Sequence, residues 1–170
     1  MTTNTIGWNS FDRGILNTVA EKLQKKKETV ALAESVTSGL LQLAFSLPDG
    51  AMNYFQGGLT AYNLGQKSRL LLVDPIHAEQ CNCVSELVAI QMARQIRVHF
   101  TSDWGIAITG YASPVPEKGI TNLFACFAFC YRNERLYSNT VKGVHKDPVQ
   151  NRLFYTNYVL QQFEEILDGN

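Results

Sequence analysis

The sequence has little charge and no excess of either sign. Only 18% of its 170 residues are charged, and 15 basic side chains balance 15 acidic ones. Proteins that hold nucleic acid or anionic membranes through their overall field are usually basic, so we expect neither as a partner. The basic cluster Lys25–Lys27 is followed by Glu28, which is typical of the solvated end of a helix.

Long hydrophobic runs are also missing. No stretch approaches the roughly 20 apolar residues of a membrane-spanning helix. The first residues lack the apolar core of a signal peptide. We therefore expect a cytoplasmic protein without a membrane anchor, in which the cysteines remain reduced thiols.

The four cysteines do not have the spacing of a zinc site. They form two pairs, Cys81/Cys83 and Cys126/Cys130, and neither pair is a C-x-x-C knuckle. The second pair lies in an apolar stretch, residues 122–131, where a thiol acts as a small buried filler. We expect no metal site and no cofactor.

What the sequence does contain is an alternation of helical and strand patterns. Helical spacing of apolar residues indicates helices over residues 9–27 and 36–47 and after Asn63, Ser85 and Asp147. Asp74-Pro75 is expected to end the third of these. Short apolar stretches typical of strands occupy residues 28–34, 54–63, 104–110, 121–131 and 135–142, and the last two form a hairpin.

Neither a repeat nor a linker interrupts this order, so we predict one domain over residues 1–170, a three-layer α/β sandwich on a mixed sheet. In such a sheet the ligand usually lies beyond the carboxyl ends of the parallel strands. Three loops would meet there, around Ser35, at 63–67 and at 110–119. The paired Gly57 and Gly58 indicate a bulge or a close approach of two backbones.

Ser35 stands where a strand gives way to a helix, in the stretch "ALAESVTSGLL". One interpretation is an N-cap, a common use of serine that contributes about 1 kcal/mol. The other is a nucleophile, because backbone N–H groups at a helix start can stabilise an oxyanion beside it. The stretch alone favours the cap.

A nucleophilic serine needs a base, and the usual arrangements are absent. None of His77, His99 and His145 lies in a triad motif, and both G-x-S-x-G and S-x-x-K are missing around Ser35. Lys67 is the candidate, but its pKa would have to fall from about 10.4 to near neutrality, mostly through burial. The sequence alone favours an exposed lysine.

Four stretches, in order, resemble the CinA C-terminal domain family. Residues 33–39 look like its A-E-S-C-T-G-G, and residues 55–67 look like its F-x-G-G-x-x-T/A-Y-S-N-x-x-K. Residues 83–86 resemble its A-V-S-E, and residues 109–114 resemble its T-G-I-A-G-P. The resemblance covers about residues 10–168, and four ordered motifs are far more specific than one.

The resemblance implies a five-stranded mixed sheet between helical layers and a homodimer or higher homo-oligomer. It also implies hydrolysis of nicotinamide mononucleotide to nicotinate mononucleotide and ammonia without a metal, a step of pyridine nucleotide recycling. By motif position the nucleophile falls on Ser35 and its base on Lys67. This reverses the preference for a capping serine and an exposed lysine.

Other motif residues are candidate supporting or substrate-binding groups: Glu34, Thr37, Gly39, Gly58, Tyr62, Asn63, Thr109 and Gly110. Backbone amides of residues 36–39 could hold the oxyanion. Thr37 and Thr109 could orient the dyad or the leaving amide. Tyr62 could stack on a pyridine ring or fill the core.

The sequence also departs from the family pattern. Val36 and Ser38 replace a cysteine and a glycine, and the glycine-rich loop after residue 114 is shortened and carries Pro114 and Pro116. Glycines let backbone N–H groups reach a phosphate, whereas prolines remove donors. We therefore expect weak or absent turnover of nicotinamide mononucleotide. The alternative is a member that acts on another amide or binds a ligand without catalysis.

Overall fold

The middle layer of the molecule is a five-stranded sheet. The computed structural model describes residues 10–132 and 135–169. Its strands are β1 (Val30–Glu34), β2 (Phe55–Thr60), β3 (Trp104–Gly110), β4 (Phe124–Tyr131) and β5 (Arg135–Lys142). They are arranged in the order β2-β1-β3-β4-β5. β1 runs parallel to β2 and β3, whereas β4 is antiparallel to β3 and β5, which confirms the mixed sheet and the hairpin.

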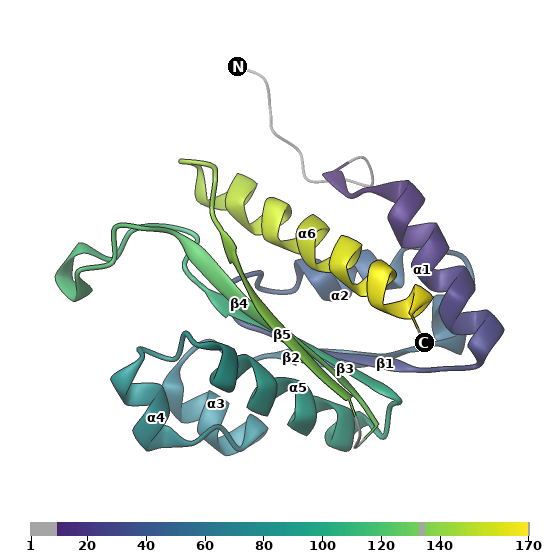
Figure 1. Ribbon diagram of the computed structural model, residues 1–170, viewed down its shortest axis with the longest axis horizontal. Coiled ribbons are helices and arrows are strands. Elements are labelled where there is room, and N and C mark those ends of the chain that lie inside the picture. Colours follow the sequence, from purple (N-terminus) through teal and green to yellow (C-terminus); the bar gives the residue numbers. More distant parts are fainter. Residues whose placement is uncertain (1–9, 133–134, 170) are drawn as a thin grey trace.

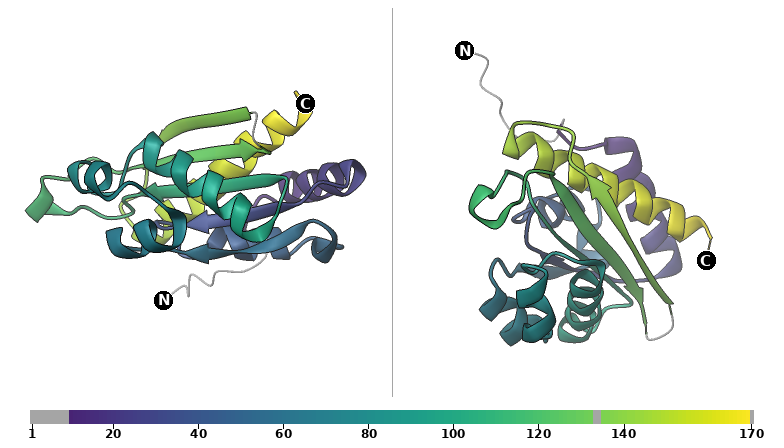
Figure 2. Two further views of the ribbon diagram at one scale, coloured as in Figure 1. Left: turned by 90° about the horizontal axis from the view of Figure 1, so that it is seen from below. Right: turned by 60° about the vertical axis from the view of Figure 1, so that its left-hand side comes forward.

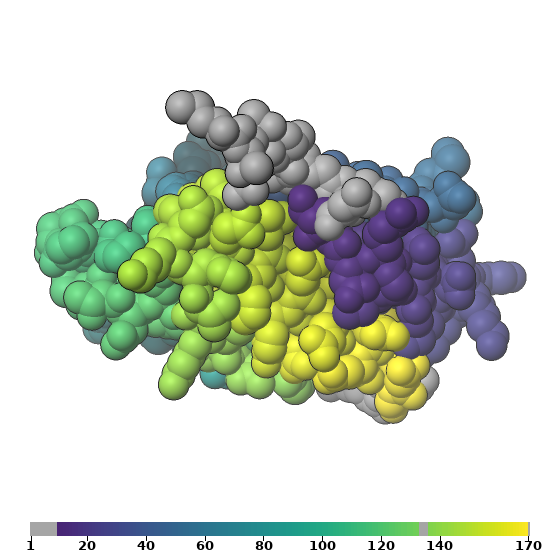
Figure 3. Space-filling model, turned by 90° about the horizontal axis from the view of Figure 1, so that it is seen from above, coloured from purple at the N-terminus to yellow at the C-terminus, as the bar shows by residue number. Residues whose placement is uncertain are grey.

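Helices cover both faces of the sheet (Figure 1). One layer holds α1 (Arg13–Lys26), α2 (Leu40–Ser46) and α6 (Pro148–Asp168), and the other holds α3 (Leu64–Leu71), α4 (Pro75–Gln80) and α5 (Glu86–Phe100). Figure 3 looks onto the first layer, where α1 and α6 lie side by side. None of the helices within the described ranges is long and apolar enough to cross a bilayer.

The two faces of the sheet differ in side-chain size. The face toward α1, α2 and α6 carries large residues: Leu32, Ile106, Ile108, Phe127 and Phe129. The face toward α5 carries small ones: Ala31, Ala33, Ala107, Cys126, Ala128 and Cys130. The buried cysteines therefore alternate with phenylalanines along β4, as successive strand residues point to opposite faces. The small face lets α5 approach the sheet closely.

Gly105 on β3 shows how close α5 lies. A Cβ at this position would collide with the carbonyl oxygen of Ala93 on α5. We expect Gly105→Ala to lower the free energy of unfolding by about 1–3 kcal/mol, because the helix must shift outward. Urea unfolding measures this. Gly14→Ala is the control, since Gly14 is exposed on α1 and a Cβ there meets nothing closer than 3.4 Å. Equal urea midpoints for Gly105→Ala and the wild type would contradict the prediction.

Several predicted element boundaries hold and others do not. Asn63, Ser85 and Asp147 cap α3, α5 and α6 as expected. Asp74-Pro75 was expected only to end a helix, yet Asp74 also caps the short α4 with proline in its first turn. The first helix begins at Arg13 after the cap Asp12, while residue 9, its predicted start, lies outside the described residues. The hairpin turn at 133–134 lies outside them too.

The glycine pair in β2 has both predicted properties. The register with β1 shifts by one residue between Val30 and Ala31, which leaves a bulge before Gly57, whose φ is 117°. A Cβ on Gly58 would collide with the carbonyl oxygen of Leu32. Gly58 therefore allows β2 to pair closely with β1.

Candidate functional site

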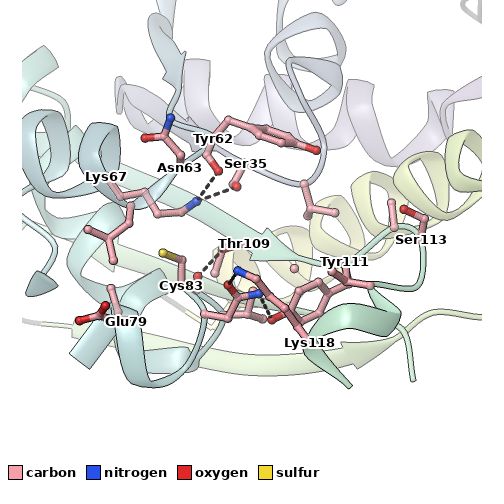
Figure 4. A pocket seen from close by; sticks show the side chains of 18 of the residues that line it. Ser35, Tyr62, Asn63, Lys67, Glu79, Cys83, Thr109, Tyr111, Ser113 and Lys118 are labelled. Carbon is pink, nitrogen blue, oxygen red and sulfur yellow. Dashed lines mark hydrogen bonds between the residues drawn. The ribbon is translucent and has the colours of Figure 1, made fainter. Parts of the chain in front are cut away.

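A cavity of about 570 Å³ lies at the carboxyl ends of β1 and β3. The three predicted loops supply much of its wall, with Ser35, residues 62–64, residues 109–113 and Val115 among the lining groups. Figure 4 shows these side chains converging from separate elements. The loops therefore meet where the sequence placed them, at the end of the parallel strands.

Ser35 and Lys67 face each other in this cavity (Figure 4). Lys67 Nζ donates a hydrogen bond to Ser35 Oγ across 2.9 Å and another to the carbonyl oxygen of Tyr62 across 3.3 Å. Ser35 directly follows β1, and its backbone N–H bonds the carbonyl oxygen of Ile108 on β3 at 3.0 Å. The sheet thus holds the backbone beneath the Ser35 hydroxyl.

Lys67 is buried, with only 1% of its surface exposed. The side chain of Asn63 caps α3, and Lys67 lies in the first turn of that helix, close to the loop between β2 and α3. Burial lowers the pKa of Lys67 below its ordinary value of 10.5, because desolvation disfavours the ammonium. A Cys83 thiolate would oppose this, but burial raises the pKa of that thiol. No described carboxylate forms an ion pair with Lys67.

We expect Lys67→Met to make the protein more stable at neutral pH, by about 0.5–2 kcal/mol. Below the lowered pKa, folding must desolvate the Lys67 charge. Between that pKa and 10.5 the unfolded chain binds the proton and the folded chain does not, so wild-type stability rises with pH. The advantage of the variant should therefore shrink from pH 7 to pH 10 in urea unfolding. Lys25→Met, at an exposed lysine on α1, is the control. A wild type as stable as Lys67→Met at every pH would contradict the prediction.

The turn between β1 and α2 corrects the prediction for Ser35. The sequence indicated a helix from residue 36 with Ser35 at its start, but α2 begins at Leu40. Gly39 occupies the cap position with a φ of 101° and no side-chain cap bond. Ser35 therefore does not cap the helix, and its hydroxyl is bonded by Lys67 instead.

The N–H groups at the start of α2 are bound by the carboxylate of Glu34, the last residue of β1, which replaces the side chain that the cap residue Gly39 lacks. Glu34 is fully buried, and its two oxygens accept bonds from the backbone N–H groups of Gly39 (3.0 Å), Leu41 (3.2 Å) and Gln42 (2.8 Å). The hydroxyl of Thr37 donates a fourth bond at 2.5 Å. A negative group at a helix N-terminus also interacts favourably with the helix dipole. Glu34 thus holds the whole turn that presents Ser35.

The same turn contains two backbone amides without an acceptor, and one of them belongs to a residue that lines the cavity. The N–H of Gly39 is bonded to Glu34, and that of Ser38 donates to the carbonyl oxygen of Ser35. Within the described structure the N–H groups of Val36 and Thr37 have no acceptor. Val36 lines the cavity beside Ser35. Thr37 is fully buried and does not line the cavity, so the predicted range of residues 36–39 is reduced to one donor on a cavity-lining residue, the N–H of Val36.

The remaining predicted residues divide into those that line the cavity and those that support it. Glu34, Thr37, Gly39 and Gly58 do not line it. Tyr62, Asn63, Thr109 and Gly110 do.

Thr109 and Tyr62 differ in part from what was expected of them. The Thr109 hydroxyl donates to the carbonyl oxygen of Cys83 at 2.8 Å and makes no bond to the dyad. Tyr62 is 63% exposed, which excludes the core-filling alternative.

Sequence reasoning missed several cavity residues. They are Asn82, Cys83, Tyr111, Lys118 and Arg152. Cys83 and Tyr111 stand within motifs, where they replace an apolar residue, and this signal could have found them. Arg152 carries no such signal, because it reaches the cavity only through the packing of α6. Among the described residues no group of three or more His, Cys, Asp or Glu side chains could hold a metal ion.

The sequence profile of the CinA C-terminal domain matches residues 12–167. The chain belongs to the CinA C-terminal domain family. One relative that is similar in sequence is Protein MG115 of Mycoplasma genitalium, which is 37% identical over 153 residues that cover 89% of this chain and 96% of the relative. A CinA-like protein of Synechocystis is 44% identical over 117 residues, but these cover only 28% of that longer protein.

Solved structures of CinA proteins have the same fold. A CinA superfamily protein from Enterobacter cloacae matches 98% of this chain and 99% of its own, with a TM-score of 0.86 and 26% identity. A competence or damage-inducible protein from Enterobacter asburiae matches 90% of this chain and 96% of its own, with a TM-score of 0.85 and 27% identity. The five-stranded α/β fold implied by the CinA resemblance is confirmed, whereas the homo-oligomer remains a prediction.

Proposed function

We propose that this CinA-family protein is a serine–lysine amidohydrolase that acts on a nucleotide-like amide. Nicotinamide mononucleotide, the substrate that the family resemblance implies, is the first compound to test, although the shortened loop with its two prolines predicts weak turnover of it. The observation that carries the proposal is the 2.9 Å contact between Lys67 Nζ and Ser35 Oγ inside a cavity. A desolvated lysine is a base of suitable strength for a serine hydroxyl.

In the first half of the reaction, the neutral amine of Lys67 takes the Ser35 proton while Oγ forms a bond to the amide carbon. The carbonyl oxygen becomes an oxyanion, for which the N–H group of the cavity residue Val36 is the available donor. Lys67 then returns the proton to the amide nitrogen. The C–N bond breaks, ammonia leaves, and the acyl group stays on Ser35.

In the second half, water takes the place of the serine. Lys67 accepts a proton from water as the hydroxide oxygen bonds to the acyl carbon, and the bond to Ser35 Oγ breaks with return of that proton to Oγ. The products are a carboxylic acid and the free enzyme. Every proton moves through Lys67, so the proposal uses no metal, and chelator-treated protein should keep its activity.

Ammonia release from a set of nicotinamide-containing compounds tests the proposal. The set is nicotinamide mononucleotide, nicotinamide riboside, free nicotinamide and the dinucleotide, each given to the wild type and to Ser35→Ala. We expect release from at least one nucleotide by the wild type alone. Release that survives in Ser35→Ala, with contamination excluded, would contradict the proposed mechanism.

The alternative, a ligand-binding protein without turnover, has a different outcome. Calorimetry would then show binding of a nucleotide by wild type and Ser35→Ala alike, with no ammonia from either. Val36, Cys83 and Tyr111 line the cavity and differ from the residues of the family motifs, which is the reason for testing this alternative in the same experiment.

A further inference from the structure

A chain of three side chains connects the two sides of the cavity mouth. Lys118, from the 3₁₀ helix η3 (Pro116–Lys118), donates from Nζ to Asn82 Oδ1 at 2.5 Å. Asn82 donates from Nδ2 to the Tyr111 hydroxyl at 2.9 Å. All three residues line the cavity, and Figure 4 shows Lys118 and Tyr111 on the side away from Lys67. The protruding loop of residues 111–123, visible in Figure 2, is thereby tied to the segment between α4 and α5.

The inner end of this chain is rigid. Tyr111 is 8% exposed, and its ring meets Phe124 edge-on with the centroids 5.5 Å apart. Its backbone N–H bonds the carbonyl oxygen of Phe124 at 2.9 Å, and its own carbonyl oxygen accepts a bond from the Tyr155 hydroxyl at 3.0 Å. Asn82 has a φ of 49°, a conformation that asparagine tolerates well. Asn82, the partner of Lys118, and Tyr111, which Asn82 bonds in turn, are therefore held before any ligand binds.

The outer end of the chain carries a charge with spare hydrogen-bonding capacity. An ammonium has three N–H donors, and Lys118 gives one of them to Asn82. Glu79 is the single carboxylate among the described cavity residues, and it forms no ion pair with Lys118. Arg152 contributes a second cation to the cavity, and its Nε has no partner within the described structure. Even without Lys67, the cavity has two cations, Lys118 and Arg152, against one carboxylate, which favours an anionic ligand.

We propose that Lys118, positioned by Asn82 and Tyr111, is a specificity-determining residue that recognises the phosphate monoester of the substrate. The inference rests on the proposed function, because it uses the same cavity and substrate class. Pro114 and Pro116 remove backbone donors from this loop. The Lys118 side chain supplies a donor from the same loop. In this chain an ammonium would therefore bind the phosphate, in place of the backbone amides that a glycine-rich loop offers. Sequence reasoning about this loop had considered its backbone alone.

Binding to the full-length Ser35→Ala protein tests this without turnover. Calorimetry compares nicotinamide mononucleotide with nicotinamide riboside, which lacks only the phosphate. We expect the added Lys118→Met substitution to weaken mononucleotide binding by about 10- to 100-fold, the usual effect of losing a charge-assisted hydrogen bond. Riboside binding should change less than about two-fold, because the riboside has no phosphate for Lys118 to hold.

Two further variants separate positioning from charge. Asn82→Gly keeps the left-handed backbone and removes the amide, and Tyr111→Phe removes only the hydroxyl. Each should reduce the preference for mononucleotide over riboside, less than Lys118→Met does. Lys25→Met, at an exposed lysine of α1, should leave both affinities unchanged.

The outcomes distinguish this inference from the proposed function. Equal weakening of both ligands by Lys118→Met, no weakening, or no mononucleotide binding by Ser35→Ala would overturn the inference. Phosphate-selective binding that depends on Lys118, in a wild type that releases no ammonia from any compound, would support the inference while the proposed function fails.

Discussion

Replacing either Ser35 or Lys67 with alanine is expected to lower kcat by about 10³- to 10⁶-fold, with the double variant little worse than either single one. Nucleophile and base act on the same proton, so losing one removes most of what the other contributes. The 2.9 Å contact between Nζ and Oγ is the basis for treating them as one unit. Steady-state ammonia release on the best substrate measures the effect.

Two matched controls accompany that measurement. Ser46→Ala removes an exposed hydroxyl at the end of α2, and Lys25→Ala removes an exposed amine from α1. Both should retain wild-type turnover. Residual activity above a few per cent in purified Ser35→Ala, or effects of the single substitutions that multiply in the double variant, would show that the dyad is assigned wrongly.

Loss of the Glu34 carboxylate is expected to have the largest effect on stability. Glu34→Ala should lower the free energy of unfolding by about 3–5 kcal/mol, since it leaves three N–H donors at the start of α2, one buried and two partly buried, and the buried Thr37 hydroxyl without their acceptor. Glu34→Gln keeps the shape and one acceptor oxygen and should cost less. Urea unfolding of both variants gives the comparison.

The control for this series is Glu21→Ala, at an exposed glutamate of α1. Thr37→Val adds a graded test, because it removes one of the four bonds to Glu34 and should cost about 1 kcal/mol. If Glu34→Ala unfolds within 1 kcal/mol of the wild type, water or another donor set replaces the cap, and Glu34 is not what holds the turn.

Local chemistry explains which parts of the fold could be predicted. Asn63, Ser85 and Asp147 predict the starts of helices because a capping side chain binds N–H groups only two or three residues away. Glu34 caps α2 from the end of a strand, five to eight positions before the amides it binds. No short pattern records that arrangement, so the sequence placed the start of this helix four residues too early.

The candidate site also has a part that could be predicted from local sequence and a part that could not. Ser35 and Lys67 could be paired from motifs, although the burial of Lys67 could not, because it depends on how α3 packs beneath the β2–α3 loop. The loop that carries Lys118 was predicted to reach the site, but the Lys118 and Arg152 side chains could not be assigned to the cavity from the sequence. Their positions follow from the folding of the 111–123 loop and from the packing of α6, both of which are tertiary effects.

The small-residue face of the sheet also divides the four thiols by their access to solvent. Cys126 and Cys130 are buried beneath α5, while Cys81 and Cys83 are half-buried next to α4. A thiol reagent reaches the first pair only in molecules whose α5 layer has lifted from the sheet, so its labelling rate reports how often that layer opens. The second pair is half-buried, and we expect it to react without this opening. The labelling rate of Cys126 and Cys130, compared with that of Cys81 and Cys83 in the same molecule, therefore measures local unfolding of the α5 layer.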